Sequence, residues 1–199
     1  MTPAALRVRL AEIAAGPMTA PAAYRDDVLP LDKPPIPAAV LVPIVLGDPP
    51  GVLLTKRTAH LSHHAGQVSF PGGRIDPEDS GPEAAALREA REEIGLDPRC
   101  VEVLGRMPDY LTGTGYRITP VLAVVPPGLR YELSAHEVES IFELPMSVVM
   151  DPDAPRMQRQ HVRGVWRDYW VWPHSQHYIW GATAAILVRL AQRLRERTA

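Results

Sequence analysis

Residues 70–96 read FPGGRIDPEDSGPEAAALREAREEIGL, a glycine-containing loop followed by a helix-forming segment. Ser80 is positioned as a helix N-cap, with Glu83 as its capping-box partner and Pro82 in the first turn. Gly95 is well placed to end the same helix, because glycine readily adopts the left-handed conformation of a C-terminal cap. The stretch therefore predicts one sharply bounded helix directly after a flexible loop.

Three carboxylates gather on one side of this predicted helix. At 100° per residue, Glu89, Glu92 and Glu93 share an arc of about 100°. Such like charges repel unless a cation lies among them, and Mg²⁺ prefers oxygen ligands of this kind. A solvated face balanced by Arg88 and Arg91 is the alternative, and the glutamates alone leave both open. The opposite face is apolar, with Leu87, Ala90 and Ile94.

The loop and the helix together resemble the Nudix box, the signature of metal-dependent hydrolases that act on diphosphates linked to another group. The second half, residues 88–96, matches fully if Ala90 counts as apolar. The first half departs from the box, because Asp79 stands in place of glutamate and eight residues, not seven, separate it from Arg88.

Further segments are similar to the coenzyme A pyrophosphatase branch of this family, and the resemblance covers roughly residues 37–190. They are LLTKR at 53–57, HAGQVSFPGG at 64–73, YLTGTGY at 110–116, TPV at 119–121 and IWGATA at 179–184. Two positions depart: Ser62 stands where the branch usually has arginine, and Thr58 where it has serine or alanine.

The resemblance implies a set of site residues. Glu89, Glu92, Glu93 and the carbonyl of Gly73 would bind Mg²⁺ or Mn²⁺. Arg88 would orient the helix carboxylates, and Glu92 is favoured as the general base over Glu137 or Glu139, whose alternative is a solvated strand edge. Substrate contacts are expected from Arg57, Ser69, Gly72 and Gly73, although a surface salt bridge is an equal reading for Arg57.

The implied reaction is hydrolysis of the diphosphate of coenzyme A or a derivative, which yields 3′,5′-ADP and 4′-phosphopantetheine. ADP-ribose, NADH or another nucleoside diphosphate derivative is the alternative substrate. A nucleotide-binding module without turnover is a second class, which the retained carboxylates disfavour.

Alternating apolar runs predict an α/β chain with a mixed sheet, and the resemblance implies a Nudix-type α/β/α sandwich. Strands are expected at 38–46, 51–57, 67–70, 101–104, 116–125 and 138–144, with a strand pair around Arg167-Asp168. Helices are expected at 4–15 and from about 179 to 197. Residues 1–36 read as a helix and a Pro/Ala-rich connector packed on a domain at 37–199.

Composition limits the partners. The chain has 199 residues and a net charge of −2, which favours a small-molecule diphosphate substrate and disfavours nucleic acid or a membrane. The single cysteine, Cys100, fits a cytoplasmic setting. His60, His63 and His64 lack the second half of a zinc site. The aromatic cluster around Trp166–Trp172 and Trp180 favours core or homodimer contacts over an adenine platform.

Overall fold

The computed structural model describes residues 2–16, 33–60, 64–162, 164–172, 174 and 176–196, and its largest element is a mixed sheet. At the centre, β1 (Ile36–Val45) and β7 (Tyr116–Val125) run parallel along their whole lengths. The remaining strands pair antiparallel: β2 (Gly51–Arg57), β3 (Val68–Ser69), β4 (Gly72–Arg74), β5 (Glu102–Arg106), β6 (Tyr110–Leu111) and β8 (Val138–Pro145).

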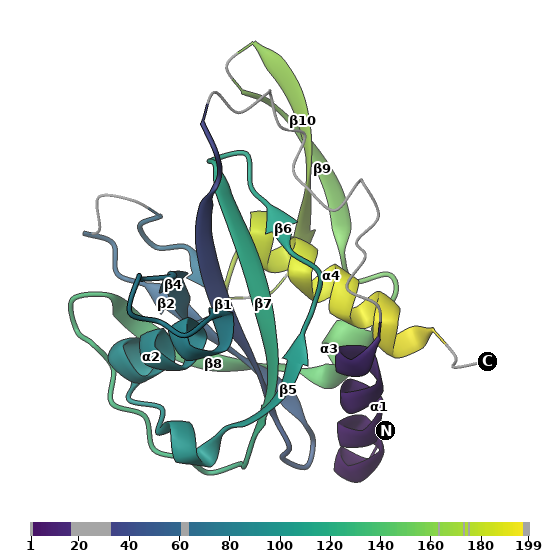
Figure 1. Cartoon of the computed structure of the whole chain (residues 1–199). Helices are drawn as coiled ribbons and strands as arrows, with labels where there is room; N and C mark the ends of the chain where they lie inside the picture. The colour runs from purple at the N-terminus through teal and green to yellow at the C-terminus, as the bar shows by residue number, and fades with distance from the viewer. Residues whose placement is uncertain are drawn as a thin grey trace.

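Helices cover both faces of this sheet (Figure 1). Strand β1 shows why, because Ala39 and Leu41 pack with α2 (Pro82–Ile94) on one face while Val42 and Ile44 belong to the cluster on the other. That second face is covered by α1 (Pro3–Ala15), α3 (Met146–Met150) and α4 (Gly181–Arg195). Successive strand side chains point to opposite faces, so a buried strand is apolar throughout. The arrangement is the α/β/α sandwich that the sequence predicts.

A second, smaller sheet projects beside the first and carries the aromatic cluster (Figure 1). It consists of β9 (Arg156–Val162), β10 (Val165–Trp172) and β11 (Ile179–Trp180). Trp172 is fully buried in the core, whereas Trp166 is 62% exposed. A strand pair is found here, but it is not centred on Arg167-Asp168 as predicted, because both residues lie inside β10 and Asp168 pairs with Arg159 across the strands. A homodimer contact stays a prediction.

The start of α2 also differs from the sequence prediction. Gly81, not Ser80, is the N-cap, and no side chain caps the helix. Glu83 does not reach back to Ser80, because its carboxylate binds Arg106 through two hydrogen bonds of 2.5 and 2.6 Å. The predicted end is confirmed: Gly95 has a φ of 66°, and its N–H bonds to the carbonyls of the last turn.

At the N-terminus, α1 places Leu6, Leu10 and Ile13 in the core cluster that also contains α4. The connector at 17–32 and Ser62 lie outside the described residues, so the proposed division at residue 36 stays a prediction. Within the described ranges, none of the helices has both the length and the apolar character needed to cross a membrane.

Candidate active site

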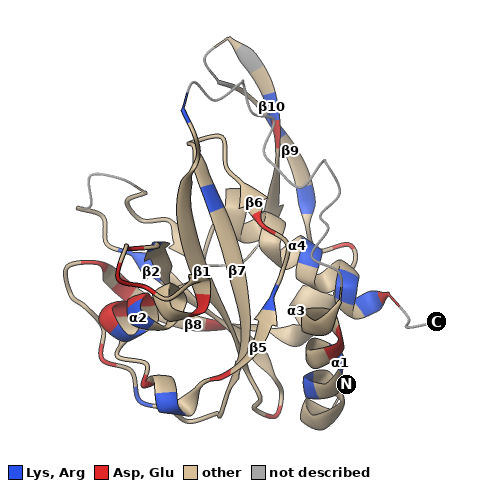
Figure 2. Cartoon of the chain, viewed as in Figure 1, with Lys and Arg blue, Asp and Glu red and all other residues tan. Residues whose placement is uncertain are grey.

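Acidic residues gather on α2 and on the loop before it (Figure 2). From Asp76 to Glu93 there are seven acidic residues and two arginines, a net charge of −5. The helix is held against β1 and β4 by four apolar residues that are fully buried, Ala85, Ala86, Ala90 and Ile94. The small alanines bring the backbone of α2 close to the sheet, so its carboxylates lie next to the glycines of β4.

Glu93 is the deepest of these carboxylates, with 2% of the residue exposed. Its Oε2 accepts a hydrogen bond from the Gly72 N–H at 3.1 Å, and its Oε1 accepts one from Arg57 Nη1 at 3.2 Å. Burial raises the pKa of Glu93 to about 7, because a charged carboxylate loses its hydration there. The Gly72 N–H and Arg57 counteract this rise, while the charges of Glu89 and Glu137 add to it.

Glu89 lies against the second glycine of the loop. A Cβ on Gly73 would lie 2.5 Å from the Glu89 carboxylate, so only glycine leaves that space free. Gly72 is confined by backbone instead, since a Cβ there would lie 2.4 Å from the carbonyl oxygen of Ala39. Burial raises the pKa of Glu89, and its ion pair with Arg88 opposes that rise.

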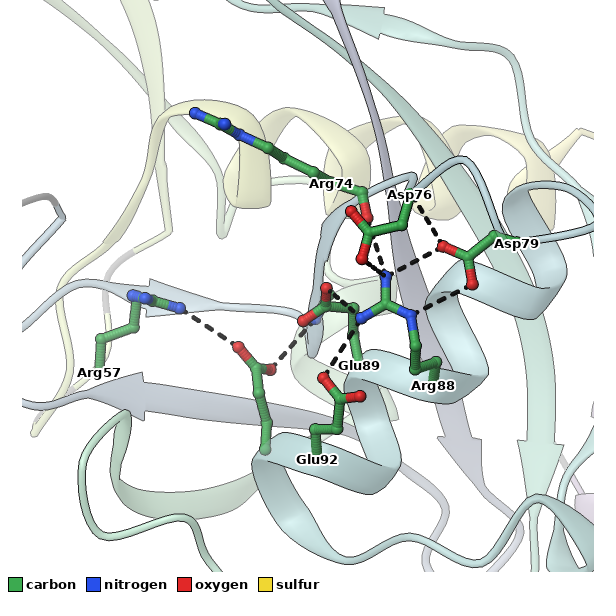
Figure 3. A network of polar contacts seen from close by, with 9 residues as sticks. Arg57, Arg74, Asp76, Asp79, Arg88, Glu89 and Glu92 are labelled. Atoms are coloured by element: carbon green, nitrogen blue, oxygen red, sulfur yellow. Dashed lines mark hydrogen bonds and ion pairs between the residues drawn. The ribbon is translucent and has the colours of Figure 1, made fainter.

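Arg88 binds the acidic loop and the helix together (Figure 3). Its Nε and Nη2 donate to the two oxygens of Asp79 at 3.1 and 3.0 Å, and Nη2 also donates to the Arg74 carbonyl. Its Nη1 donates to Glu89 at 2.8 Å and to Glu92 at 3.2 Å. Asp79 thus reaches Arg88 despite being one carbon shorter than glutamate and one residue further away along the chain.

Glu92 is the exposed member of the three carboxylates, with 59% of its side chain accessible. Its Oε2 accepts the hydrogen bond from Arg88. Among the described residues, no three His, Cys, Asp or Glu side chains form a group ready to hold a metal ion. The structure therefore brings Glu89 and Glu93 to the glycine loop and leaves Glu92 at the solvent edge, on the same helix.

The two glutamates near the start of β8, Glu137 and Glu139, have different surroundings. Glu137 lies close enough to Glu89 and Glu93 for its charge to raise the pKa of both. Glu139 is instead paired with Lys56, with 2.6 Å between Nζ and Oε1. Glu137 is thus part of the acidic cluster, and Glu139 is not brought into it.

The expected substrate contacts line one pocket at the glycine loop. Arg57 ends β2, and its Nε is buried without a hydrogen-bond partner among the described residues. Ser69 lies on β3, where its hydroxyl is 3.1 Å from that of Thr55. Both line one pocket of about 420 Å³ together with Gly72 and Gly73.

This pocket is built from segments far apart in the sequence. Besides β1 and the segment at 64–74, it is lined by Thr112 and Thr114 from the turn before β7, by Tyr116 at the start of β7, and by residues 180–183 at the start of α4. Its volume falls within the range of small-molecule sites. Sequence reasoning noted the segments at 110–116 and 179–184 but gave them no site role, because nothing in a linear pattern shows which turns meet across a sheet.

The donors fit a hard divalent cation. Glu89, Glu92, Glu93 and the Gly73 carbonyl offer only oxygen, the ligand type that Mg²⁺ and Mn²⁺ prefer. Burial and mutual repulsion raise the pKa of Glu89 and Glu93, and a nearby positive charge would relieve that repulsion. In this arrangement, Arg57 and Arg88 supply the positive charge.

A mixed sheet between helical layers, with an acidic helix behind a Gly-Gly loop, defines the class of protein. The model of the NUDIX domain matches residues 35–176, and the chain belongs to this family. It is therefore a Nudix hydrolase, a pyrophosphohydrolase, and members of the family typically use a divalent metal.

Curated relatives are similar over most of the chain. An uncharacterized Nudix hydrolase, NudL, of Enterobacter sp. (strain 638) is 44% identical over 79% of this chain and 82% of its own length. NudL of Escherichia coli K12 is 43% identical with the same coverage. Among solved structures, the NUDIX domain of Shewanella oneidensis NrtR, complexed with ADP ribose, has a TM-score of 0.51 at 19% identity. That match covers 83% of this chain and 89% of the domain, and it supports the fold.

Proposed function

We propose that the chain hydrolyses the diphosphate bond of coenzyme A or its derivatives, yielding 3′,5′-ADP and 4′-phosphopantetheine. One observation carries this proposal: three segments that resemble the coenzyme A branch line a single pocket beside the acidic helix. They are His64 to Gly73, the turn at Thr112–Tyr116, and Trp180–Thr183. Their meeting at one site supports the idea that they act on one ligand.

In this proposal, the residues divide the work between binding and proton transfer. Arg57 binds the diphosphate, because its Nε has no hydrogen-bond partner among the described residues and its guanidinium lies at the pocket wall. The N–H of Gly72 and the hydroxyl of Ser69 assist on the same side. Glu92 takes the proton of the attacking water at Oε1, since its Oε2 is already bound to Arg88.

Glu89, Glu92, Glu93 and the Gly73 carbonyl would hold Mg²⁺ or Mn²⁺. Such an ion, when bound, neutralises the diphosphate and lowers the pKa of water. Asp79 positions Arg88, and Arg88 positions the carboxylates of Glu89 and Glu92. A cytoplasmic setting remains a prediction from the single cysteine.

The decisive experiment is a substrate panel. Coenzyme A, acetyl-coenzyme A, ADP-ribose and NADH are incubated with Mg²⁺, with Mn²⁺ and with EDTA, and products are separated by chromatography. We expect 3′,5′-ADP from coenzyme A or its acyl form, with the highest kcat/KM, and no product in EDTA. A higher kcat/KM for ADP-ribose or NADH would contradict the substrate assignment, and Glu93→Gln should abolish metal-dependent hydrolysis.

A further inference from the structure

A second guanidinium reaches the same pocket at a place away from the acidic helix. Arg74 follows the Gly-Gly pair, and its side chain points away from the cluster around Arg88 (Figure 3). Its Nη2 donates to the Tyr116 hydroxyl at 3.2 Å, and its guanidinium carbon lies 5.8 Å from the centre of the Tyr116 ring. Arg74 and Tyr116 both line the pocket, as does Arg57.

The head group of Arg74 has no carboxylate partner among the described residues. The nearby acid on its own loop, Asp76, forms its ion pair with Arg88 Nη2 at 3.4 Å and acts on Arg74 only through its charge, which helps to raise the pKa of Arg74. Arg57, by contrast, is paired with Glu93. Within the described part of the chain, only Nη2 of the Arg74 guanidinium forms a hydrogen bond, to the Tyr116 hydroxyl, so several of its donors remain for a ligand.

The pocket that the two arginines share is lined mainly by apolar residues. Val40 and Ile118 come from the central strands, Ile186 comes from α4, and the threonines of the turn at 112–114 add hydroxyls. A ligand that satisfies this pocket has one anionic group at Arg57, a neutral body along the apolar wall, and a second anionic group at Arg74. A free diphosphate has no neutral body to fill the apolar part of this pocket.

We infer that Arg74, held by Tyr116, binds a phosphate monoester of the substrate separate from the diphosphate that is cleaved, and so selects substrates that carry one. The inference rests on the proposed function, because it takes the diphosphate to lie at Arg57. The planar guanidinium can bind two oxygens of a terminal phosphate, a geometry that a lysine cannot reproduce.

The test compares coenzyme A with 3′-dephospho-coenzyme A, which lacks only the monoester. We expect Arg74→Gln to raise KM about tenfold for coenzyme A, as for the loss of a charge-assisted hydrogen bond, with kcat within about twofold. For the dephospho substrate, both constants should stay within about twofold. Arg74→Lys should be intermediate.

Arg117→Gln is the matched control, because Arg117 is exposed on β7 beside Tyr116 but does not line the pocket. It removes the same charge from the strand that carries Tyr116 and should leave both substrates unaffected. Equal changes in KM for the two substrates with Arg74→Gln, or no change for either, would overturn the inference.

Binding separates this inference from the proposed function. If the wild-type chain cleaves neither substrate, the proposed function fails, and calorimetric titration with adenosine 3′,5′-bisphosphate and AMP still tests Arg74. The wild-type chain should bind the bisphosphate about tenfold more tightly, and Arg74→Gln should lose that preference. Equal affinities in the wild-type chain would refute a monoester site at Arg74.

Discussion

Arg57 and Glu93 form the innermost ion pair of the site, with 3.2 Å between Nη1 and Oε1. Arg57 also lines the pocket, and its Nε is buried without a partner among the described residues. One guanidinium therefore both offsets the charge of a buried carboxylate and faces the space proposed for the diphosphate. Binding of an anion at Arg57 and ionisation of Glu93 are coupled through this contact.

Replacing Arg57 by glutamine should destabilise the metal-free chain in a pH-dependent way. At pH 8, Glu93 is charged and would lose its partner, so we expect a loss of about 2 kcal/mol in the free energy of unfolding. At pH 5.5, Glu93 is largely protonated and the loss should be smaller. Urea denaturation in EDTA at the two pH values measures the difference.

Lys56→Gln is the control for this change, because Lys56 lies next to Arg57 and pairs with the exposed Glu139. Exposed pairs contribute little, so its cost should be below about 1 kcal/mol at both pH values. Equal destabilisation by Arg57→Gln at pH 5.5 and pH 8 would show that Glu93 is not the group Arg57 stabilises.

Glu93 should also make the stability of the metal-free chain fall as pH rises. Its pKa is about 7 in the folded chain and 4.5 as an ordinary glutamate, so the folded state binds more protons between these values. The contribution of Glu93 to the free energy of unfolding is therefore highest below about pH 4.5 and is lost by about pH 7, a change of roughly 3 kcal/mol.

Glu93→Gln should flatten the pH dependence of the free energy of unfolding, measured by urea denaturation in EDTA from pH 5 to 8. The same slope in both proteins would refute the raised pKa.

The sequence was sufficient to predict the acidic helix, because its apolar and its acidic residues each recur at helical spacing and Gly95 ends it. It was insufficient for β4, since Gly72-Gly73 has the composition of a turn. These glycines form β4 by pairing with β1, and at Gly72 the backbone of Ala39 and Val40 lies too close for any side chain. The need for glycine there arises from a tertiary contact that local patterns do not contain.

The other differences between the structure and the sequence prediction arise where side chains contact residues that are distant in the sequence. Glu83 matches a capping box in sequence, but Arg106, which is 23 residues away, outcompetes the local backbone for its carboxylate. Thr112 and Tyr116 line the same pocket as Arg74 because β7 and β4 both pair with β1. Sequence spacing predicts which residues share a helix face, and it does not predict which turns close a pocket.

The proposed proton transfer assigns different roles to two exposed glutamates. Glu92→Gln should lower kcat for coenzyme A by about 10² to 10⁴ and leave KM nearly unchanged, because it removes a base that acts in the chemical step. Glu139→Gln should change kcat less than about threefold, since Lys56 holds Glu139 outside the cluster. Initial rates at saturating Mg²⁺ measure both.

Glu102→Gln serves as the control for this pair, because Glu102 is exposed on β5 and its carboxylate pairs with Arg7. It should leave kcat and KM unchanged. A larger loss with Glu139→Gln than with Glu92→Gln would transfer the role of base to Glu139 and refute the assignment.

The two glycines of the loop should respond differently to alanine. At Gly73, a Cβ meets the Glu89 carboxylate, the far end of a flexible side chain that can move aside. At Gly72, it meets the Ala39 carbonyl oxygen and the Val40 Cα, which belong to the central strand, and the φ of 156° adds strain. We therefore expect Gly73→Ala to lower the initial rate of coenzyme A hydrolysis at least about tenfold, while Tm shifts by only a few degrees. Gly72→Ala should lower the free energy of unfolding by about 3 kcal/mol or more. Thermal denaturation and initial rates measured on both variants separate the two effects. If Gly73→Ala retained full activity, the position of Glu89 would not matter for the reaction, and its place among the proposed metal ligands would be lost.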